Sequence, residues 1–224
     1  MLMPWAIDEM KNVDLKDKRL NDRLTAVLSQ LGGHPTASVP AACGGNSEMT
    51  AAYRLFDNKK VCFDNVLEPH IEATRRRMAE QPVVILAQDT TEIDLTRPQQ
   101  QVAGAGPLDG GSRRGLFLHP LHAFTPDGTP LGTVHADVWA RDDEPPPSKS
   151  EWTAKRKQTL IEEKESQRWI DTLRRACEEA RRVPETRVVC VADSEADIYE
   201  LLEESQEELQ PLHWIVRACQ NRAL

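Results

Sequence analysis

The sequence predicts an α/β protein in which a small helical module precedes a mixed β-sheet with its covering helices. Apolar residues recur at spacings of three and four between Leu20 and Leu31, which is typical of an amphipathic helix. The period changes at Val83, where short β-branched and aliphatic runs begin. Two of these runs, residues 83–89 and 187–193, each end in an aspartate. We therefore divide the chain into a helical domain, residues 1–82, and an α/β domain, residues 83–224.

The composition favours an ordinary globular protein, because 39% of its 224 residues are hydrophobic and 29% are charged. No apolar run approaches the ~20 residues that a membrane helix needs, and the amino terminus lacks the build of a signal peptide. We therefore expect a cytoplasmic protein without membrane contact. The net charge of −8 argues mildly against a nucleic-acid coat protein, although local basic patches decide phosphate contact. The five cysteines form no CxxC pair, so we expect reduced thiols.

Three helices are predicted in the first domain. The first contains the Leu20–Leu31 stripe and stops at Gly32-Gly33, the second begins near Ser47 as its N-cap, and the third begins at Asp64. The face of the first helix opposite its stripe carries four basic side chains among aspartates: Lys16, Lys18, Arg19 and Arg23. That face is either a solvated surface or a contact with DNA.

In the second domain the pattern predicts three antiparallel-type strands, a helix, a strand, a helix and a strand. These elements are residues 83–88, 116–124, 131–139, 151–182, 187–192, 195–204 and 214–217. Asp127-Gly128 forms a hairpin turn, and the Gly-rich stretch 99–115 is expected to be a mobile loop. The apolar stripe of the long helix is interrupted by Lys164, Glu165 and Arg168. That turn either overhangs the sheet or presents a polar patch to an active site or a nucleic acid.

The two strand-end aspartates, Asp89 and Asp193, are the candidate metal ligands. Neighbouring strands lie ~4.8 Å apart, so carboxylates at matching ends of parallel neighbours can share a cation. Mg²⁺ prefers oxygen ligands and needs one or two protein carboxylates beside phosphate oxygens and water. The alternative is that each aspartate only caps a turn or helix. A haloacid-dehalogenase-type phosphatase requires Asp-x-Asp, whereas the sequence reads Asp89-Thr90-Thr91-Glu92, which counts against that class.

Several stretches, taken in order, resemble one protein family. Gln88-Asp89-Thr90-Thr91 and the stretch 192–199, Ala-Asp-Ser-Glu-Ala-Asp-Ile-Tyr, are similar to bacterial DD-E cut-and-paste transposases. The likeness is to the superfamily of insertion sequence four, which includes the transposase of transposon Tn-five. Four further stretches fit the same family in the same order: residues 17–24, 52–56, 163–169 and 214–217.

The resemblance implies a DNA-binding domain for transposon ends, followed by a ribonuclease H-like catalytic domain in which the first and fourth strands are adjacent. It implies that Asp89 and Asp193 bind Mg²⁺ or Mn²⁺ for DNA strand cleavage and transfer. The residues that match DNA-contacting positions of the family are Arg19, Arg23, Arg54 and Arg217.

The family's third carboxylate is a glutamate in a Tyr-x-x-x-Arg-x-x-x-x-x-x-Glu signature that this sequence does not contain. We expect an incomplete catalytic site, and we expect that no acid after Asp193 replaces the glutamate, because the following helix should lead away. Three functions stay open. They are a DNA transposase or its amino-terminal portion, a relic that binds transposon-end double-stranded DNA or full-length transposase without chemistry, and an unrelated metal-dependent phosphatase or nuclease. A homodimer is a further possible assembly.

Overall fold

The computed structural model describes residues 2–97, 100–110, 112–143, 161, 164–204 and 209–221. The chain divides into two compact units, Met1–Arg76 and Arg77–Leu224, and each is described here by itself. Across the described ranges no helix is both long enough and apolar enough to span a membrane.

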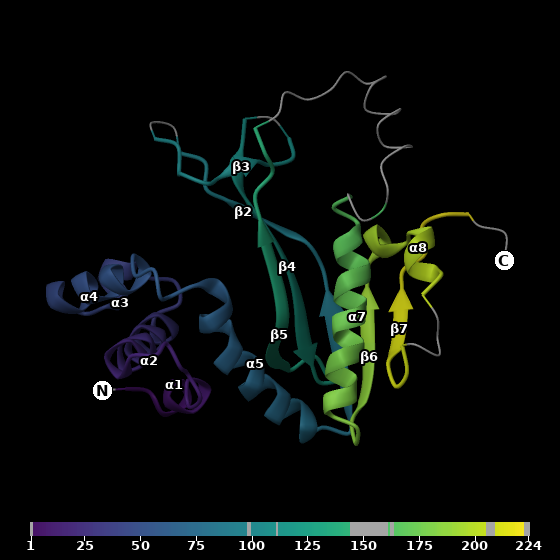
Figure 1. The fold of residues 1–224 in the computed structure, drawn as a ribbon, viewed down its shortest axis with the longest axis horizontal. Helices are drawn as coiled ribbons and strands as arrows, with labels where there is room; N and C mark the ends of the chain where they lie inside the picture. The colour runs from purple at the N-terminus through teal and green to yellow at the C-terminus, as the bar shows by residue number, and fades with distance from the viewer. Residues whose placement is uncertain are drawn as a thin grey trace. The chain divides into compact units, whose positions relative to one another are not determined.

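The first unit is helical (Figure 1). Its elements are α1 (Pro4–Glu9), α2 (Lys18–Gly33), α3 (Val39–Ala42), α4 (Asn46–Phe56) and the larger part of α5 (Phe63–Ala79). The predicted Leu20–Leu31 stripe of α2 packs against α1 and α4, and a small apolar core forms around Leu24, Val27, Ala52 and Leu55. A half-buried hydrogen bond between the Glu9 carboxylate and His70 Nδ1 joins α1 to α5. The helical character of this unit is therefore confirmed.

The predicted end of the first helix is confirmed, because α2 ends at Gly33, whereas the other two helices begin at different residues from those predicted. A Cβ at Gly32 would overlap the ring of Trp5, so this glycine also permits close packing of α1 on α2. Gly45, not Ser47, is the N-cap of α4, and Asp64 lies within the first turn of α5. An acidic side chain in a first turn interacts favourably with the positive end of the helix dipole.

The second unit contains one mixed sheet whose elements run in the order β2-β4-β1-β6-β7, with β3 and β5 also paired to β4. The strands are β1 (Val83–Gln88), β2 (Thr91–Asp94), β3 (Gly106–Pro107), β4 (Arg114–Phe124), β5 (Pro130–Trp139), β6 (Arg187–Ala192) and β7 (His213–Val216). The pairs β1–β4 and β4–β5 are antiparallel, whereas β1–β6 and β6–β7 are parallel. The predicted α/β class with a mixed sheet is confirmed.

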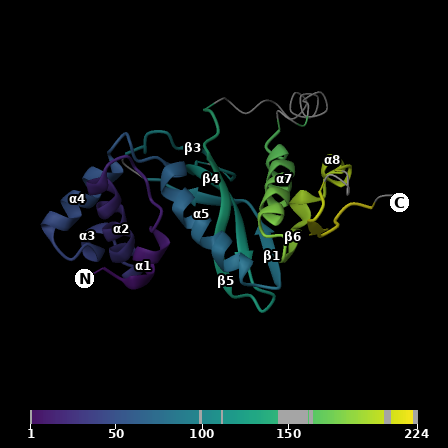
Figure 2. The same ribbon diagram turned by 60° about the horizontal axis from the view of Figure 1, so that its bottom comes forward.

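Helix α7 (Gln167–Arg182) covers one face of the sheet and contacts β1, β4, β5 and β6 (Figures 1 and 2). Alternate residues of β1 point toward it, so that Val84 and Leu86 are fully buried against Leu173 and Ala176. This is the period-2 pattern of a strand with one buried face. The alternation places Asp89, the first residue after β1, beyond the end of the packed core.

Neither of the two helices predicted for this unit is continuous. Within the helix predicted over residues 151–182, residues 164–166 form turns that precede α7, and residues 151–160, 162 and 163 lie outside the described ranges. The helix predicted over residues 195–204 is a 3₁₀ turn, η2 (Ser194–Ala196), followed by the single turn of α8 (Tyr199–Leu202). The stretch 99–115 contains β3, and Gly115 allows close pairing because a Cβ there would overlap the Ile93 carbonyl.

The packing of α7 generates the first prediction. Leu173 is 1% exposed in the core between α7 and the sheet, so Leu173→Ala should lower the free energy of unfolding by about 2–5 kcal/mol. Arg175→Ala, on the exposed side of the same helix, is the matched control and should change it by less than about 0.5 kcal/mol. Urea unfolding followed by circular dichroism measures both values. Equal effects of the two substitutions would contradict the placement of α7.

Candidate functional site

The parallel pairing of β1 with β6 places the two predicted aspartates side by side. Val83 is opposite Arg187 and the register continues without a shift to Gln88 opposite Ala192. Asp89 and Asp193 are the next residues of the two strands, so they leave the sheet at neighbouring positions of the same edge. Adjacent strands are separated by ~4.8 Å, which is the spacing that the sequence argument required. Asp89 is exposed and Asp193 is half-buried.

A chain of buried polar groups lies directly beneath Asp89. The Asp89 Oδ1 atom accepts the Thr90 backbone N–H at 2.8 Å, and the Thr90 hydroxyl lies 2.7 Å from His119 Nδ1. His119 Nε2 lies 3.3 Å from Gln88 Oε1, while the Gln88 amide donates to the sulfur of Cys190. Because the Gln88 oxygen is an acceptor, Nε2 carries the proton and Nδ1 accepts from Thr90. The strand end is therefore held by a directional network on both sides of Asp89.

The imidazole of His119 is uncharged in this network. The ring is fully buried and packs edge-on against Trp169, with centroids 4.8 Å apart. Burial lowers the pKa of His119 to about 4, because a charged ring would lose its hydration there. Nothing in the sequence pattern singled out His119, because the alternation of β4 marks its position only as buried.

Asp193 caps a turn, which is one of the two roles that the sequence left open, and it also contacts Arg217. Its Oδ1 atom accepts the Glu195 N–H at 2.7 Å and so caps the η2 turn, as the capping alternative predicts. Its Oδ2 atom accepts from Arg217 Nη2 at 3.2 Å, and the same nitrogen donates to the Ser194 hydroxyl at 3.1 Å. A carboxylate oxygen has two lone pairs, so each of these oxygens keeps a site for a further ligand.

Glu195 lies near both aspartates, contrary to the expectation that the acids after Asp193 would lead away. It belongs to the short η2 turn instead of a helix. Partial burial, and then the negative charges of Asp193, Asp89 and Asp109, raise the pKa of the Glu195 carboxyl. The edge of the sheet is therefore strongly acidic, and a cation there would relieve the repulsion among the carboxylates.

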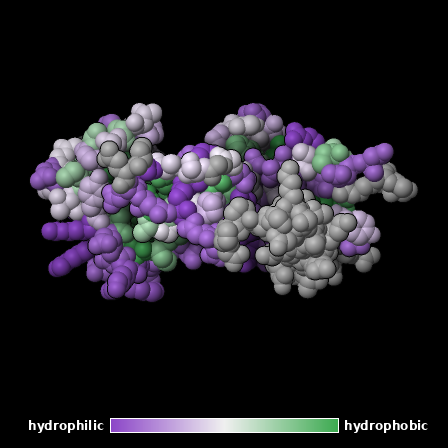
Figure 3. All heavy atoms as spheres, turned by 90° about the horizontal axis from the view of Figure 1, so that it is seen from above, coloured by the Kyte–Doolittle hydropathy of each residue, from purple (hydrophilic) through white to green (hydrophobic). Residues whose placement is uncertain are grey.

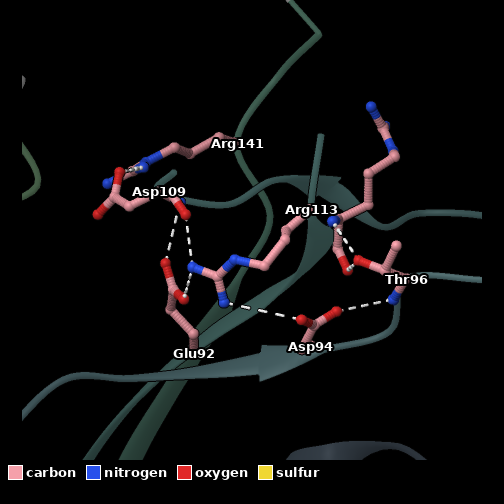
Figure 4. A network of polar contacts seen from close by, with 7 residues as sticks. Glu92, Asp94, Thr96, Asp109, Arg113 and Arg141 are labelled. Carbon is pink, nitrogen blue, oxygen red and sulfur yellow. Dashed lines mark hydrogen bonds and ion pairs between the residues drawn. The ribbon is translucent and has the colours of Figure 1, made fainter. Parts of the chain in front are cut away.

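An open cavity of about 330 Å³ adjoins the same edge and is lined in part by Thr90, Glu92, Phe117, Glu165 and Glu195. Its wall is a network of ion pairs (Figure 4). Arg113 binds Glu92 at 2.6 Å and Asp94 at 3.7 Å, and it donates to the Asp109 carbonyl. The Asp109 N–H in turn donates to Glu92 at 2.9 Å. These contacts attach the loop that follows β3 to β2.

Arg141 joins this network to the start of α7. It binds both oxygens of Glu165, at 2.7 and 2.6 Å, and Asp109 at 2.6 Å. The bidentate contact lowers the pKa of the Glu165 carboxyl. Glu165 also accepts from the Trp139 indole at 3.1 Å. Glu165 of the polar turn therefore lines this cavity, whereas Lys164 and Arg168 line a neighbouring pocket beside Asp137.

Stacking holds these groups in place. The rings of Phe117 and Trp139 stack with centroids 5.3 Å apart, Arg141 lies over Phe117 at 4.2 Å, and Arg168 lies over Trp139 at 3.7 Å. Both outer faces of the aromatic pair are thus covered by guanidinium groups. The sequence contained no local signal for this stack, because its members come from β4, β5, the segment after β5 and α7.

The predicted arginines of the first unit occupy different environments. Arg19 and Arg54 are exposed, whereas Arg23 is half-buried and donates to Glu48 of α4 at 2.5 Å. Lys18 pairs with Asp22 at 2.6 Å, as the solvated-face alternative expects. Hydrophilic side chains project from this unit, on the left of Figure 3. Of the two arginines on α2, Arg19 is therefore the more accessible for contact with a phosphate.

The buried state of His119 predicts a dependence of stability on pH. With a folded pKa of about 4 and an ordinary value of 6.5, the unfolded chain binds a proton that the folded chain does not. The stability conferred by the neutral ring is therefore complete above pH 6.5 and falls as the pH drops toward 4, by about 2 kcal/mol between pH 7 and pH 5.

We expect His119→Gln to flatten the profile of unfolding free energy against pH in that interval. His213→Gln, at an exposed position, is the matched control for the same chemical change. Urea unfolding at pH 5, 6 and 7 measures the three profiles. A slope that is identical in wild type and His119→Gln would contradict the assignment.

Comparison with known families addresses the first unit. Residues 2–61, which contain α1 to α4, match a family model described as transposase DNA-binding. No curated protein matches the chain. The match supports a transposase-related role in DNA binding for these residues. The chain therefore carries a transposase DNA-binding domain within its first unit.

Proposed function

We propose that this chain acts in DNA transposition by metal-dependent cleavage and transfer of DNA strands. In this proposal the first unit binds double-stranded DNA at transposon ends, and Asp89 and Asp193 bind Mg²⁺ or Mn²⁺. The observation that carries the chemistry is the unbroken parallel register of β1 and β6, which brings the two carboxylates to neighbouring positions. The match of residues 2–61 to a transposase DNA-binding family supports DNA as the substrate.

The chemistry of the donors at the strand ends fits a hard divalent cation in part. Asp89 uses one oxygen to accept the Thr90 N–H, and its other oxygen has no hydrogen bond from a described residue. Asp193 keeps lone pairs on both oxygens. One or two protein carboxylates suffice for Mg²⁺ when phosphate oxygens and water complete its shell. When bound, such a cation stabilises the charge that develops on the oxygens of a phosphoryl transfer.

The residues around the aspartates contribute orientation. Thr90, held by neutral His119, fixes the backbone that donates to Asp89, so this carboxylate does not have to be ordered when DNA binds. The guanidinium of Arg217 stands beside Asp193 with its side chain 70% exposed, where it is available to a phosphate. Arg19, Arg23 and Arg54 of the first unit supply contacts to transposon-end DNA in this proposal.

The sheet order supports a ribonuclease H-like core for the second unit. The resemblance requires the first predicted strand to lie beside the fourth predicted strand, residues 187–192, which is β6. In the sheet, β1 lies between β4 and β6 and so meets this requirement. The antiparallel pairs β1–β4 and β4–β5 on one side of β1 and the parallel pairs β1–β6 and β6–β7 on the other side agree with the same arrangement. Membership of the insertion-sequence-four superfamily and likeness to the transposon Tn-five transposase are parts of this proposal.

A second candidate is a protein that binds transposon-end DNA, or pairs with itself or with full-length transposase, and does no chemistry. Two observations favour it. Within the described ranges no group of three or more His, Cys, Asp or Glu side chains is arranged to hold a metal ion. In addition, Arg217 already contacts Asp193 and competes for its charge. The two candidates share the DNA-binding unit and differ only in catalysis.

The two candidates are separated by nicking of supercoiled plasmid DNA in the presence of Mg²⁺ or Mn²⁺. The enzyme candidate predicts nicking that Asp89→Asn or Asp193→Asn each reduces by about 100-fold or more, because the two ligands act as a unit. Asp171→Asn, an exposed carboxylate on α7, is the matched control and should nick normally. Binding of DNA without nicking in wild type would exclude catalysis by this chain and favour the second candidate.

The DNA-binding unit is tested by the dependence of affinity on salt. Arg19→Ala/Arg23→Ala should weaken binding of transposon-end DNA and make the slope of log K against log salt shallower by about 2, since each lost phosphate contact removes ~0.9. Arg175→Ala/Arg182→Ala removes the same charge from exposed positions of α7 and is the control. Fluorescence anisotropy between low and physiological salt gives the slopes. An unchanged slope in the first double variant would place the DNA elsewhere.

A further inference from the structure

A further aspartate, Asp197, lies four residues after Asp193 in the sequence and has no part in the chemistry proposed above. Asp197 follows the η2 turn as its C-cap residue and is only 6% exposed. Removing a carboxylate from water is costly unless hydrogen bonds compensate for the lost hydration. The groups that satisfy Asp197 therefore indicate what this buried charge holds in place.

Two backbone groups of the segment that follows β7 are bound to Asp197. The Oδ2 atom of Asp197 accepts the N–H of Cys219 at 2.7 Å and the N–H of Gln220 at 2.8 Å. Hydrogen bonds to an ionised acceptor are about twice as strong as neutral ones. Two successive amides directed at one oxygen fix both the position and the direction of the chain at residues 219–220.

The same two segments meet at further points nearer the aspartates. The Arg217 N–H donates to the Ala192 carbonyl at 3.1 Å, which continues the parallel pairing of β6 and β7 by one residue. The Cys219 thiol lies 3.5 Å from the Ser194 carbonyl. The Arg217 guanidinium then reaches Asp193 and Ser194 through Nη2. Arg217 thus stands between two anchors, the Ala192 bond before it and the Asp197 bonds after it.

Burial does not orient the side chain of Arg217, because 70% of it is exposed. The direction of the side chain therefore depends on the position and orientation of the Arg217 backbone. Asp197 holds that backbone through the amides of Cys219 and Gln220. A guanidinium has five N–H groups, and among the described residues only the Nη2 nitrogen of Arg217 makes hydrogen bonds. The remaining donors are directed to solvent beside the strand-end carboxylates.

We propose that Asp197 is a positioning residue: its buried carboxylate holds the backbone at Cys219 and Gln220 and so keeps the Arg217 guanidinium beside Asp193, where it meets a phosphate. That the phosphate belongs to DNA rests on the function proposed above. Asp197 itself touches neither the DNA nor the cation. Its effect passes through Arg217, which makes the proposal testable by the coupling of the two residues.

The test uses the full chain with Asp197→Asn, which preserves shape, Asp197→Ala, Arg217→Ala and the double variant Asp197→Asn/Arg217→Ala. Amide hydrogen exchange by NMR reports the anchor. We expect exchange at Cys219 and Gln220 to accelerate by about tenfold to a hundredfold in Asp197→Ala and by less in Asp197→Asn. The Nε–H signal of Arg217, assigned by its loss in Arg217→Ala, should shift in Asp197→Asn as it does in Asp193→Asn. Asp171→Asn is the control and should change neither.

The second readout is affinity for duplex DNA at fixed salt. Arg217→Ala should weaken binding by about threefold to tenfold, and Asp197→Asn should weaken it in wild type but not in the Arg217→Ala background. Additive losses would mean that Asp197 acts independently of Arg217 and would overturn the proposal. Unchanged exchange, or an unchanged Arg217 signal, would overturn it as well.

The two proposals fail in distinguishable ways. If the wild-type chain binds no DNA, the proposed function is wrong, while the NMR readouts still decide whether Asp197 positions Arg217. Melting temperatures of all variants accompany the measurements. If Asp197→Ala does not fold, Asp197→Asn alone decides the outcome through the Arg217 signal and the double-variant cycle.

Discussion

The parallel pairing of β1 with β6 is the constraint on which the candidate site depends. It joins residues about one hundred positions apart and fixes which side chains meet at the strand ends. A slip of one residue would turn Val188 and Cys190 out of the core and bring Arg187 into it, so burial selects against that register. A slip of two residues would keep the faces but separate Asp89 from Asp193 by a further ~6.6 Å along the strand. The apolar core therefore sets the spacing of the acids.

The polar groups below the edge stabilise this arrangement further. Gln88, His119 and Thr90 each lie at least half-buried, and each has a partner in the network. A buried network of polar side chains is favourable only when every group in it has a hydrogen-bond partner. A group without a partner loses its hydration and gains no hydrogen bond in exchange. Neutral His119 meets this requirement by donating on one side and accepting on the other. Protonation would break the pattern, which links the order of the Asp89 strand end to pH.

The sequence predicted five of the seven strands of the described residues, missed the short strands β2 and β3, and predicted the site only in part. The strands were identifiable because one buried face gives a period of two, and turn residues such as Asp127-Gly128 mark their ends. The pattern only allowed Asp89 and Asp193 to be neighbours, and it was the family resemblance that implied adjacent first and fourth strands, which the parallel register of β1 and β6 bears out. The Arg141–Glu165–Asp109 contacts were not predictable, because they join residues 24 and 32 positions apart through loops with no periodic pattern. The roles of Arg19, Arg23 and Arg54 stay predictions.

The wrong helix after Asp193 has a physical cause that also explains the position of Glu195. Helical periodicity over residues 195–204 predicted a continuous helix, but the η2 turn ends at its C-cap residue, Asp197. Asp193 caps this turn through the Glu195 N–H, whereas the Asp197 carboxylate is held by amides of residues 219–220, and Ile198 is extended with ψ of 146°. The chain therefore turns sharply and leaves Glu195 at the acidic edge instead of carrying it away. A local pattern cannot reveal these contacts of Asp197, because they are made with residues that follow β7.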